Sequence, residues 1–357
     1  MPDIVPLGRA DPALGDARKE VFTRGLIVTT PCDNGSMSTK TTIATLSREI
    51  LTESDAYRHL EGLRWGSTPV CAHCGATDVY LIPPANGVSR KTAGGTMSER
   101  RVWKCRDCRR QFSVLTGTMM HATKIPVRTW ILVIFDMIAA KNGISAREVE
   151  RKYGVCPRTA WHMLHRIREA MAGPYRTMFQ GVVMADEAYI GGEPENRHAW
   201  QRGPERSGRG TEKTPVVSII DRETGEVRSH VVTNVDGTTL GRILMGNVDP
   251  AGSTLVTDQF KGYNVAGSFF SKHETVNHSA GEYVRDGFTT NPVESFFSQL
   301  KRSIDGTHHH VSVKHLGRYV AEHDFRRSTC KVADVDRLAI LAKQMEGRLS
   351  YEHLSHG

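Results

Sequence analysis

The chain has 357 residues, of which 39% are hydrophobic, so it is long and apolar enough for two or three domains with buried cores and is not a disordered chain. A formal net charge of +8 favours a polyanionic partner, with nucleic acid as the first candidate, although ribosomal and membrane-surface proteins are basic as well. The start of the chain lacks a secretory signal, and the longest apolar run, at 130–140, is too short to cross a bilayer. We therefore expect no membrane association and a location in the cytoplasm.

The first 65 residues divide into an unassigned stretch and a helical one. Residues 1–46 mix Pro, Gly and Thr without a sustained period, so this N-terminal extension is assigned no structure and is open to disorder. Between residues 47 and 65, apolar side chains such as Ile50, Leu60 and Leu63 recur at roughly helical spacing. This periodicity predicts a short helical segment that leads into the next unit.

Two CxxC pairs follow, and their spacing predicts a metal site. The pairs are Cys71 with Cys74 and Cys105 with Cys108. Short β-like runs lie beside them at 79–82 and 102–104. Each pair can place two thiolates in one tight turn, and two such turns supply the tetrahedral sulfur set that zinc prefers. The alternative is two unrelated pairs of reactive or buried cysteines. Because four cysteines complete the shell, His73 is expected not to bind the metal.

Residues 127–171 are strongly helical and contain the pattern of a helix-turn-helix. The first helix of the pair begins at Ser145, Gly154 makes the turn, and Pro157 suits the first position of the second helix. With the apolar positions of the second helix turned to the core, four polar residues remain for a DNA groove: Arg158, Thr159, His162 and Arg166. A plain helical hairpin that links two domains is the alternative.

The second half of the chain has the pattern of an α/β domain. A buried strand at 182–185 is expected to end at Asp186, a hairpin is expected within 215–232, and another strand, at 253–257, runs into Asp258. Two carboxylates at the ends of neighbouring strands can share divalent cations, because hard Mg²⁺ seeks oxygen ligands and phosphoryl transfer uses two such ions about 4 Å apart. The sequence therefore predicts part of a two-metal site.

A further ligand is expected from a helix that begins after Thr290. At about 100° per residue, Glu294 and Lys301 lie about 20° apart around the helix and Asn291 about 60° from Glu294, so all three can share one face. Glu294 would complete the metal site, and the Lys301 ammonium could hold a DNA phosphate. For any one of these carboxylates taken alone, a surface position or a helix cap is the alternative.

These motifs, in this order, resemble those of the bacterial insertion-sequence transposases that carry an N-terminal zinc ribbon and a DDE-type, ISXO2-like, ribonuclease-H-like catalytic domain. The likeness covers roughly residues 47–327. Besides the cysteine pairs, its carriers include Arg64-Trp65, Phe112-Ser-Val-Leu-Thr-Gly-Thr118, Lys141-Asn-Gly-Ile-Ser145, Thr159-Ala-Trp-His-Met-Leu-His-Arg-Ile-Arg168, Asp186-Glu-Ala-Tyr-Ile-Gly-Gly192, Thr257-Asp258, Val276-Asn-His-Ser279, Asn291-Pro-Val-Glu294, Lys301-Arg302, His309-His-Val-Ser312 and Lys314-His315-Leu316.

The resemblance implies a transposase that binds the terminal inverted repeats of an insertion sequence and, with two Mg²⁺ or Mn²⁺ ions, cleaves 3′ ends and transfers strands. It also implies that Asp186 and Asp258 are the first two catalytic carboxylates. The third position stays open between Asn291, which members of this group often carry there, and Glu294, which we favour as the stronger metal ligand. Where the family commonly has Thr after Asp-Glu, this chain has Ala188, which leaves both acids intact.

A basic insert lies between residues 197 and 213. Its arginines include Arg202, Arg206 and Arg209 among Gly and Pro. We expect a flexible loop that contacts DNA after the first acid, with a solvated loop as the alternative.

The expected fold is multidomain. After the N-terminal extension, residues 47–120 hold the helical segment and the zinc ribbon, 121–175 the helix-turn-helix, 176–330 the α/β ribonuclease-H-like domain with a mixed sheet, and 331–357 a helical tail. The expected partners are double-stranded DNA, both element ends and target, and further copies of the chain, since acting on two ends calls for at least a dimer on DNA. Such a protein would associate with the nucleoid when bound to DNA. Two competing functions are a catalytically silent DNA-binding regulator derived from a transposase and a ribonuclease-H-like nuclease that cleaves without joining.

Overall fold

The computed structural model describes residues 41–84, 87, 89–91, 97–173, 177–192, 213–277, 284–285 and 287–356. Most of the N-terminal extension and the basic insert lie outside these described residues. The interpretation of Arg202, Arg206 and Arg209 as DNA contacts therefore stays a prediction.

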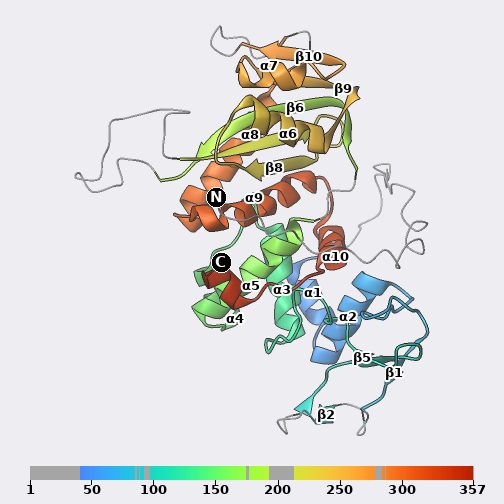
Figure 1. The fold of residues 1–357 in the computed structure, drawn as a ribbon. Helices are drawn as coiled ribbons and strands as arrows, with labels where there is room; N and C mark the ends of the chain where they lie inside the picture. The colour runs from blue at the N-terminus through green and yellow to red at the C-terminus, as the bar shows by residue number, and fades with distance from the viewer. Residues whose placement is uncertain are drawn as a thin grey trace, which may run out of the picture. The chain divides into compact units, whose positions relative to one another are not determined.

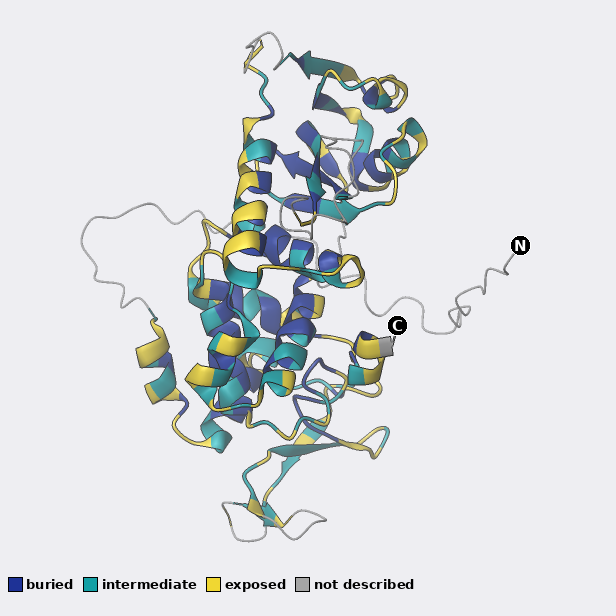
Figure 2. Ribbon diagram, turned by 90° about the vertical axis from the view of Figure 1, so that its left-hand side faces the viewer, coloured by how far each residue is buried: buried dark blue, intermediate teal, exposed yellow. Residues whose placement is uncertain are grey.

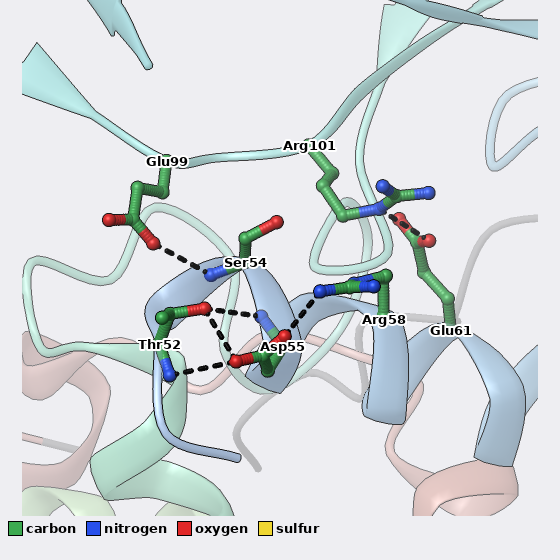
Figure 3. Close-up of polar contacts among 7 residues, drawn as sticks. All are labelled: Thr52, Ser54, Asp55, Arg58, Glu61, Glu99 and Arg101. Carbon is green, nitrogen blue, oxygen red and sulfur yellow. Dashed lines mark hydrogen bonds and ion pairs between the residues drawn. The ribbon is translucent and has the colours of Figure 1, made fainter. Parts of the chain in front are cut away.

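The helical segment before the first cysteine pair consists of two helices rather than one. They are α1 (Ile43–Glu49) and α2 (Glu53–Trp65). The break falls where Thr52 starts a new helix: its Oγ1 accepts a hydrogen bond from the Asp55 N–H at 3.1 Å, and the Asp55 carboxylate accepts one from the Thr52 N–H at 3.0 Å (Figure 3). This reciprocal capping satisfies two backbone donors that would otherwise lack partners, so α2 begins there and not earlier.

The ribbon contains a three-stranded antiparallel sheet that is attached to α2. Its strands, in the order β1-β4-β5, are β1 (Val79–Ile82), β4 (Val102–Cys105) and β5 (Gln111–Phe112), and the short strands β2 (Arg90–Lys91) and β3 (Met97–Ser98) pair separately. The attachment runs through Glu61, whose carboxylate accepts from Arg101 Nε and from Trp103 Nε1, both at 2.8 Å. Near the start of α2, the Ser54 N–H donates to the Glu99 carboxylate at 3.0 Å (Figure 3). These contacts hold the ribbon sheet against α2.

The central helices share one apolar core with the C-terminal part of the chain. They are α3 (Val127–Ala139), α4 (Ala146–Tyr153), α5 (Pro157–Met171) and α10 (Asp334–Gln344). The short helix α11 (Tyr351–His356) comes after α10. The Ser145 hydroxyl caps α4, Gly154 ends it in the left-handed conformation at φ 65°, and Pro157 is the first residue of α5, as these residue types favour. Leu338 and Leu341 of α10 belong to the same buried core as α3 and α5, so α10 is an integral part of this core. Figure 2 shows buried residues, in dark blue, gathered where the helices pack together.

A five-stranded mixed sheet forms the centre of the α/β part. In the order β10-β9-β6-β7-β8, its strands are β6 (Phe179–Ile190), β7 (Thr214–Asp221), β8 (Val227–Val231), β9 (Val248–Asp258) and β10 (Lys272–Val276) (Figure 1). The first three strands form an antiparallel meander, and β9 and β10 run parallel to β6. The mixed sheet expected of a ribonuclease-H-like domain is thus present.

Helices cover both faces of this sheet. One face packs against α6 (Gly237–Asn247) and α7 (Gly262–Gly267). The other packs against α8 (Asn291–Ser303), a short π-helical turn (Ile304–His308) and α9 (Val313–Ser328). The predicted acids Asp186 and Asp258 project from the face that α8 covers.

The predicted end of the first strand at Asp186 is wrong. β6 continues to Ile190, since β7 pairs with it as far as Ile190 opposite Thr214. The acidic residues at 186 and 187 interrupt the apolar pattern but not the backbone ladder. An antiparallel neighbour that supplies hydrogen bonds on one side is enough to extend the strand past them.

A buried ion-pair cluster connects α5 to α9. The fully buried Glu322 carboxylate accepts from Arg168 Nε of α5 at 2.6 Å and also pairs with Arg326, one turn further along α9. The backbone of Gly143 passes so close that an added Cβ would lie 2.6 Å from Glu322 Oε1. Breaking a buried pair by removing one partner costs roughly 3–5 kcal/mol, so these residues hold the two helices in one arrangement.

Buried histidines in the same region predict loss of stability in acid. Burial, followed by the charge of a nearby arginine, lowers the pKa of His165 to about 2 and that of His323 to about 3. At pH values between these pKa values and the ordinary histidine pKa near 6.5, the two histidines are protonated in the unfolded chain and neutral in the folded chain. The free energy of unfolding should therefore fall as the pH drops below about 6.5, by up to about 1.4 kcal/mol per pH unit for each histidine.

Urea unfolding measured between pH 7 and pH 4 checks this expectation. His323→Gln should reduce the pH slope, whereas His353→Gln, at an exposed position, should leave it unchanged. Equal slopes in the wild type and both variants would show that the buried histidines do not contribute.

None of the helices in the described part of the chain is long and apolar enough to span a bilayer.

Candidate active site and zinc centre

The four cysteines of the two CxxC pairs converge on one point. They are Cys71, Cys74, Cys105 and Cys108, and their sulfur atoms all lie within 4.8 Å of one another. They come from turns that flank β1 and β4, while the His73 ring is placed beside the Gln111 carbonyl at 3.3 Å. Among the residues that the structure describes, no other set of three or more His, Cys, Asp or Glu side chains converges in this way.

The chemistry of this cluster fits a divalent cation. Burial alone would raise the pKa of the Cys71 thiol, but hydrogen bonds from the amides of His73 and Cys74 and from neighbouring thiols lower it to about 7. The Ala76 amide lowers the pKa of Cys74, yet burial and the other thiols raise it to about 12. One thiolate is therefore accessible near neutral pH, and a cation such as zinc would be needed to hold all four sulfurs ionised together.

The strand register brings Asp186 and Asp258 to the same part of the sheet. Met184 of β6 pairs with Val256 of the parallel strand β9, and each aspartate lies two residues further along its strand. Because side chains alternate between faces, both carboxylates project from the face that carries Met184 and Val256. This is the face that α8, the helix with Glu294, covers.

The electrostatics of Asp186 show that the predicted acids influence one another. Burial raises the pKa of Asp186 to about 7, and the charges of Glu187, Asp258 and Glu294 act in the same direction, against a hydrogen bond from the Glu187 N–H at 2.8 Å. The charges of Asp258 and Glu294 therefore act on Asp186, whose side chain is half-buried. The three carboxylates do not form a converged shell like that of the cysteines, and a cation that neutralised them would draw them together.

The predicted residues of α8 occupy different positions relative to this site. Glu294 lies in the first turn, where its carboxylate accepts from the Thr290 hydroxyl at 3.0 Å and affects Asp186. Asn291 is the exposed first residue of the helix, and Lys301 is exposed in its last turn. Of the two candidates for the third ligand, Glu294 is the one with an electrostatic interaction with Asp186.

Tyr263 is a residue of this region that sequence reasoning missed. Its fully buried hydroxyl donates to Glu187 Oε2 at 3.1 Å, and burial, with Glu187, Asp186 and Asp258 nearby, raises its pKa well above 10. It is therefore a neutral donor beside the acids and orients the carboxylate that follows Asp186. The only signal in the sequence is an aromatic residue shortly after Asp258.

The predicted DNA-contacting residues of α5 divide into two pairs. His162 Nε2 lies 3.3 Å from the Leu349 carbonyl, and Arg166 Nε donates to the same oxygen at 3.0 Å. Both side chains therefore contact the backbone of the C-terminal segment. Arg158 lies over the Tyr351 ring, with its guanidinium carbon 5.1 Å from the ring centre. Thr159 is half-buried at the start of the helix, where its hydroxyl lies 3.0 Å from the Cys156 Sγ. Only the first turn of α5 therefore presents these side chains without a backbone contact to the tail.

Comparison with known proteins identifies two domains. Residues 178–328 match the family model of the ISXO2-like transposase domain, and residues 51–111 match that of the transposase zinc-ribbon domain. A relative described as an uncharacterized protein in transposable element ISH50, from Halobacterium salinarum, is 28% identical over 290 residues, which cover 78% of this chain and 92% of the relative.

Solved structures with some likeness include two retroviral proteins. The catalytic core domain of BIV integrase is 12% identical and matches 40% of this chain and 80% of its own, with a TM-score of 0.26. A chain of the simian T-cell lymphotropic virus intasome in complex with a PP2A regulatory subunit is 12% identical and matches 50% of this chain and 63% of its own, with the same TM-score.

The cysteine cluster and the mixed sheet lie within the two segments that match. The chain thus combines a segment similar to the transposase zinc-ribbon domain with one similar to the ISXO2-like transposase domain, and a protein of a transposable element resembles most of its length.

Proposed function

We propose that this protein binds the terminal inverted repeats of an insertion sequence and catalyses metal-dependent cleavage at the 3′ ends followed by strand transfer. The observation that carries the proposal is the raised pKa of Asp186, which reflects its burial and the nearby charges of Asp258 and Glu294. A half-buried carboxyl group whose pKa is raised by burial and by neighbouring acids is typical of functional sites, and carboxylate oxygens are the ligands that Mg²⁺ prefers.

The proposed ligands of the catalytic cations are Asp186, Asp258 and Glu294. Two Mg²⁺ or Mn²⁺ ions, when bound, would supply activation of the attacking oxygen and stabilisation of the leaving oxygen in an in-line displacement at phosphorus. The carboxylates hold their oxygens on one face of the sheet, and the Glu187 and Phe260 N–H groups orient Asp186 and Asp258 at 2.8 and 3.0 Å. Lys301, two turns beyond Glu294, would hold a phosphate of the DNA strand.

DNA binding is assigned to the basic elements outside the acidic site. The start of α5, with the exposed Arg158 and the half-buried Thr159, is the proposed groove-contacting part of the helix-turn-helix, while the zinc ribbon contributes further basic side chains. Because two element ends must be joined to one target, we propose at least a dimer on DNA. The proposed location is a reducing cytoplasm, in which cysteines remain available for zinc and the protein associates with nucleoid DNA.

The decisive experiment incubates the full chain with a duplex that carries the end sequence flanking the gene, with Mg²⁺ or Mn²⁺. We expect cleavage at the 3′ end and joining of that end to a second duplex, both abolished by EDTA. Binding without cleavage would instead indicate a regulator derived from a transposase. Cleavage without joining would indicate a nuclease.

A further inference from the structure

A cavity of about 320 Å³ lies on a part of the molecule that the proposed chemistry does not use. Its walls are the end of α3 with the turn that follows, one side of α8, the C-terminal end of α9, and one residue of α10. Four lining residues carry positive charge: Lys141, Arg326, Arg327 and Arg337. None of the lining residues is acidic, so the cavity is suited to an anion.

Two of these arginines are buried and have donors without partners. Arg326 and Arg337 are each only 7% exposed. Nε and Nη1 of Arg326, and Nη2 of Arg337, find no hydrogen-bond partner among the described residues. The cost of a buried donor without a partner is about 1–3 kcal/mol for a neutral group and more for a charged one. These atoms have almost no accessible surface, so the two side chains contribute buried positive charge in the wall of the cavity and not donors that open into it.

The remaining contacts of the two guanidinium groups leave an excess of positive charge. Arg326 Nη2 donates to the Met137 carbonyl at 3.1 Å and pairs with Glu322, a carboxylate that it shares with Arg168. Arg337 donates from Nε to Thr329 Oγ1 and from Nη1 to Asp334, both at 2.9 Å. Two carboxylates thus face three buried arginines, and Lys141 and Arg327 add further charge at the cavity.

Burial lowers the pKa of Arg337, and the nearby charge of Arg326 acts in the same direction, against the opposing effect of Asp334. The two guanidinium groups therefore repel one another. An anion in the cavity that both residues line would relieve this repulsion and accept hydrogen bonds from the accessible cations Lys141 and Arg327. A phosphate group fits best, since its several oxygens match the fork of donors that an arginine offers.

We propose that this cavity binds a phosphate group, either free inorganic phosphate or a backbone phosphate of a DNA strand. The site is separate from the acidic one, because Ser295 and Gln299, which line it, lie about 100° and 140° around α8 from Glu294. A bound phosphate would connect the helix that carries Glu294 to α9 and α10. Binding of phosphate in this cavity does not require activity at the acidic site.

The test uses the full chain and titration calorimetry at constant ionic strength. Inorganic phosphate is the first probe, and a short single-stranded oligonucleotide of unrelated sequence is the second. The double variant Lys141→Gln/Arg327→Gln removes two cations that are not buried, and should weaken binding of the effective probe by about tenfold or more, as expected for loss of charged donors. The control Lys124→Gln/Lys343→Gln removes the same charge from exposed positions elsewhere and should bind like the wild type.

A second variant addresses the buried donors. Arg337→Lys keeps the charge but removes the fork, and circular dichroism with thermal unfolding shows whether it folds. If the wild type binds inorganic phosphate and the double variant does not, the cavity is a site for the free ion. If the double variant loses binding only of the oligonucleotide, the cavity is a site for a backbone phosphate. If neither probe distinguishes the double variant from its control, the proposal is wrong. Asp258→Ala should bind either probe normally, so failure of the catalytic proposal would be recognised separately.

Discussion

Replacing Asp258 with alanine is expected to reduce cleavage and joining of end-sequence DNA by about 10³-fold or more while leaving the chain folded. A metal ligand contributes several kcal/mol to the stability of the transition state, and each 1.4 kcal/mol is about a tenfold change in rate. Asp258 also raises the pKa of the half-buried Asp186, so its removal relieves a repulsion. The thermal unfolding temperature should therefore be unchanged or higher. The measurements are single-turnover rates with saturating Mg²⁺ and a calorimetric scan of the same sample.

Asp249→Asn is the matched control, because Asp249 lies at the other end of β9, where it accepts from Gln180 Nε2 at 3.2 Å. Its activity should equal that of the wild type. The same assay decides the third ligand: Glu294→Gln should be as inactive as Asp258→Ala, whereas Asn291→Ala should retain most activity. The opposite result would move the third ligand to Asn291, and full activity of Asp258→Ala would refute the two-metal mechanism.

Loss of zinc is expected to unfold the ribbon. Replacing Cys105, a fully buried ligand, with serine should abolish the binding of about one zinc per chain, whose contribution in small zinc domains is on the order of 10 kcal/mol. The ribbon core is too small to replace this: apart from Cys71 and Cys105 its buried apolar residue is Phe112, packed against Trp65 and Trp103. Elemental analysis and tryptophan fluorescence, with and without a chelator, provide the measurement.

The control is Cys156→Ser, at an exposed cysteine outside the cluster. It should keep its zinc and its fluorescence. Because the large helical core does not include the cysteines, Cys105→Ser should retain most of its helical circular dichroism. A variant with full zinc content and unchanged fluorescence would contradict the assignment of the four cysteines as one centre.

Several features of the site could be predicted because they depend on local chemistry. The two CxxC turns, the α4–α5 pair with Ser145, Gly154 and Pro157 at its boundaries, and the strand that runs into Asp258 all follow from residue types at short spacing. The place of Asp186 inside β6 could not be predicted in the same way. Whether a strand ends at an acid depends on its neighbour, and β7 is separated from β6 by a long stretch of chain.

The sequence by itself determined which groups can bind metal and on which elements they lie, since thiolate pairs and helical spacing are properties of neighbouring residues. Only the tertiary structure decided that the C-terminal segment contacts His162 and Arg166, and that Arg326 and Arg337 meet at one cavity. The physical reason is that these contacts join residues far apart in the chain. They arise when α5, α9 and α10 pack together, and neither periodicity nor motif spacing records that packing.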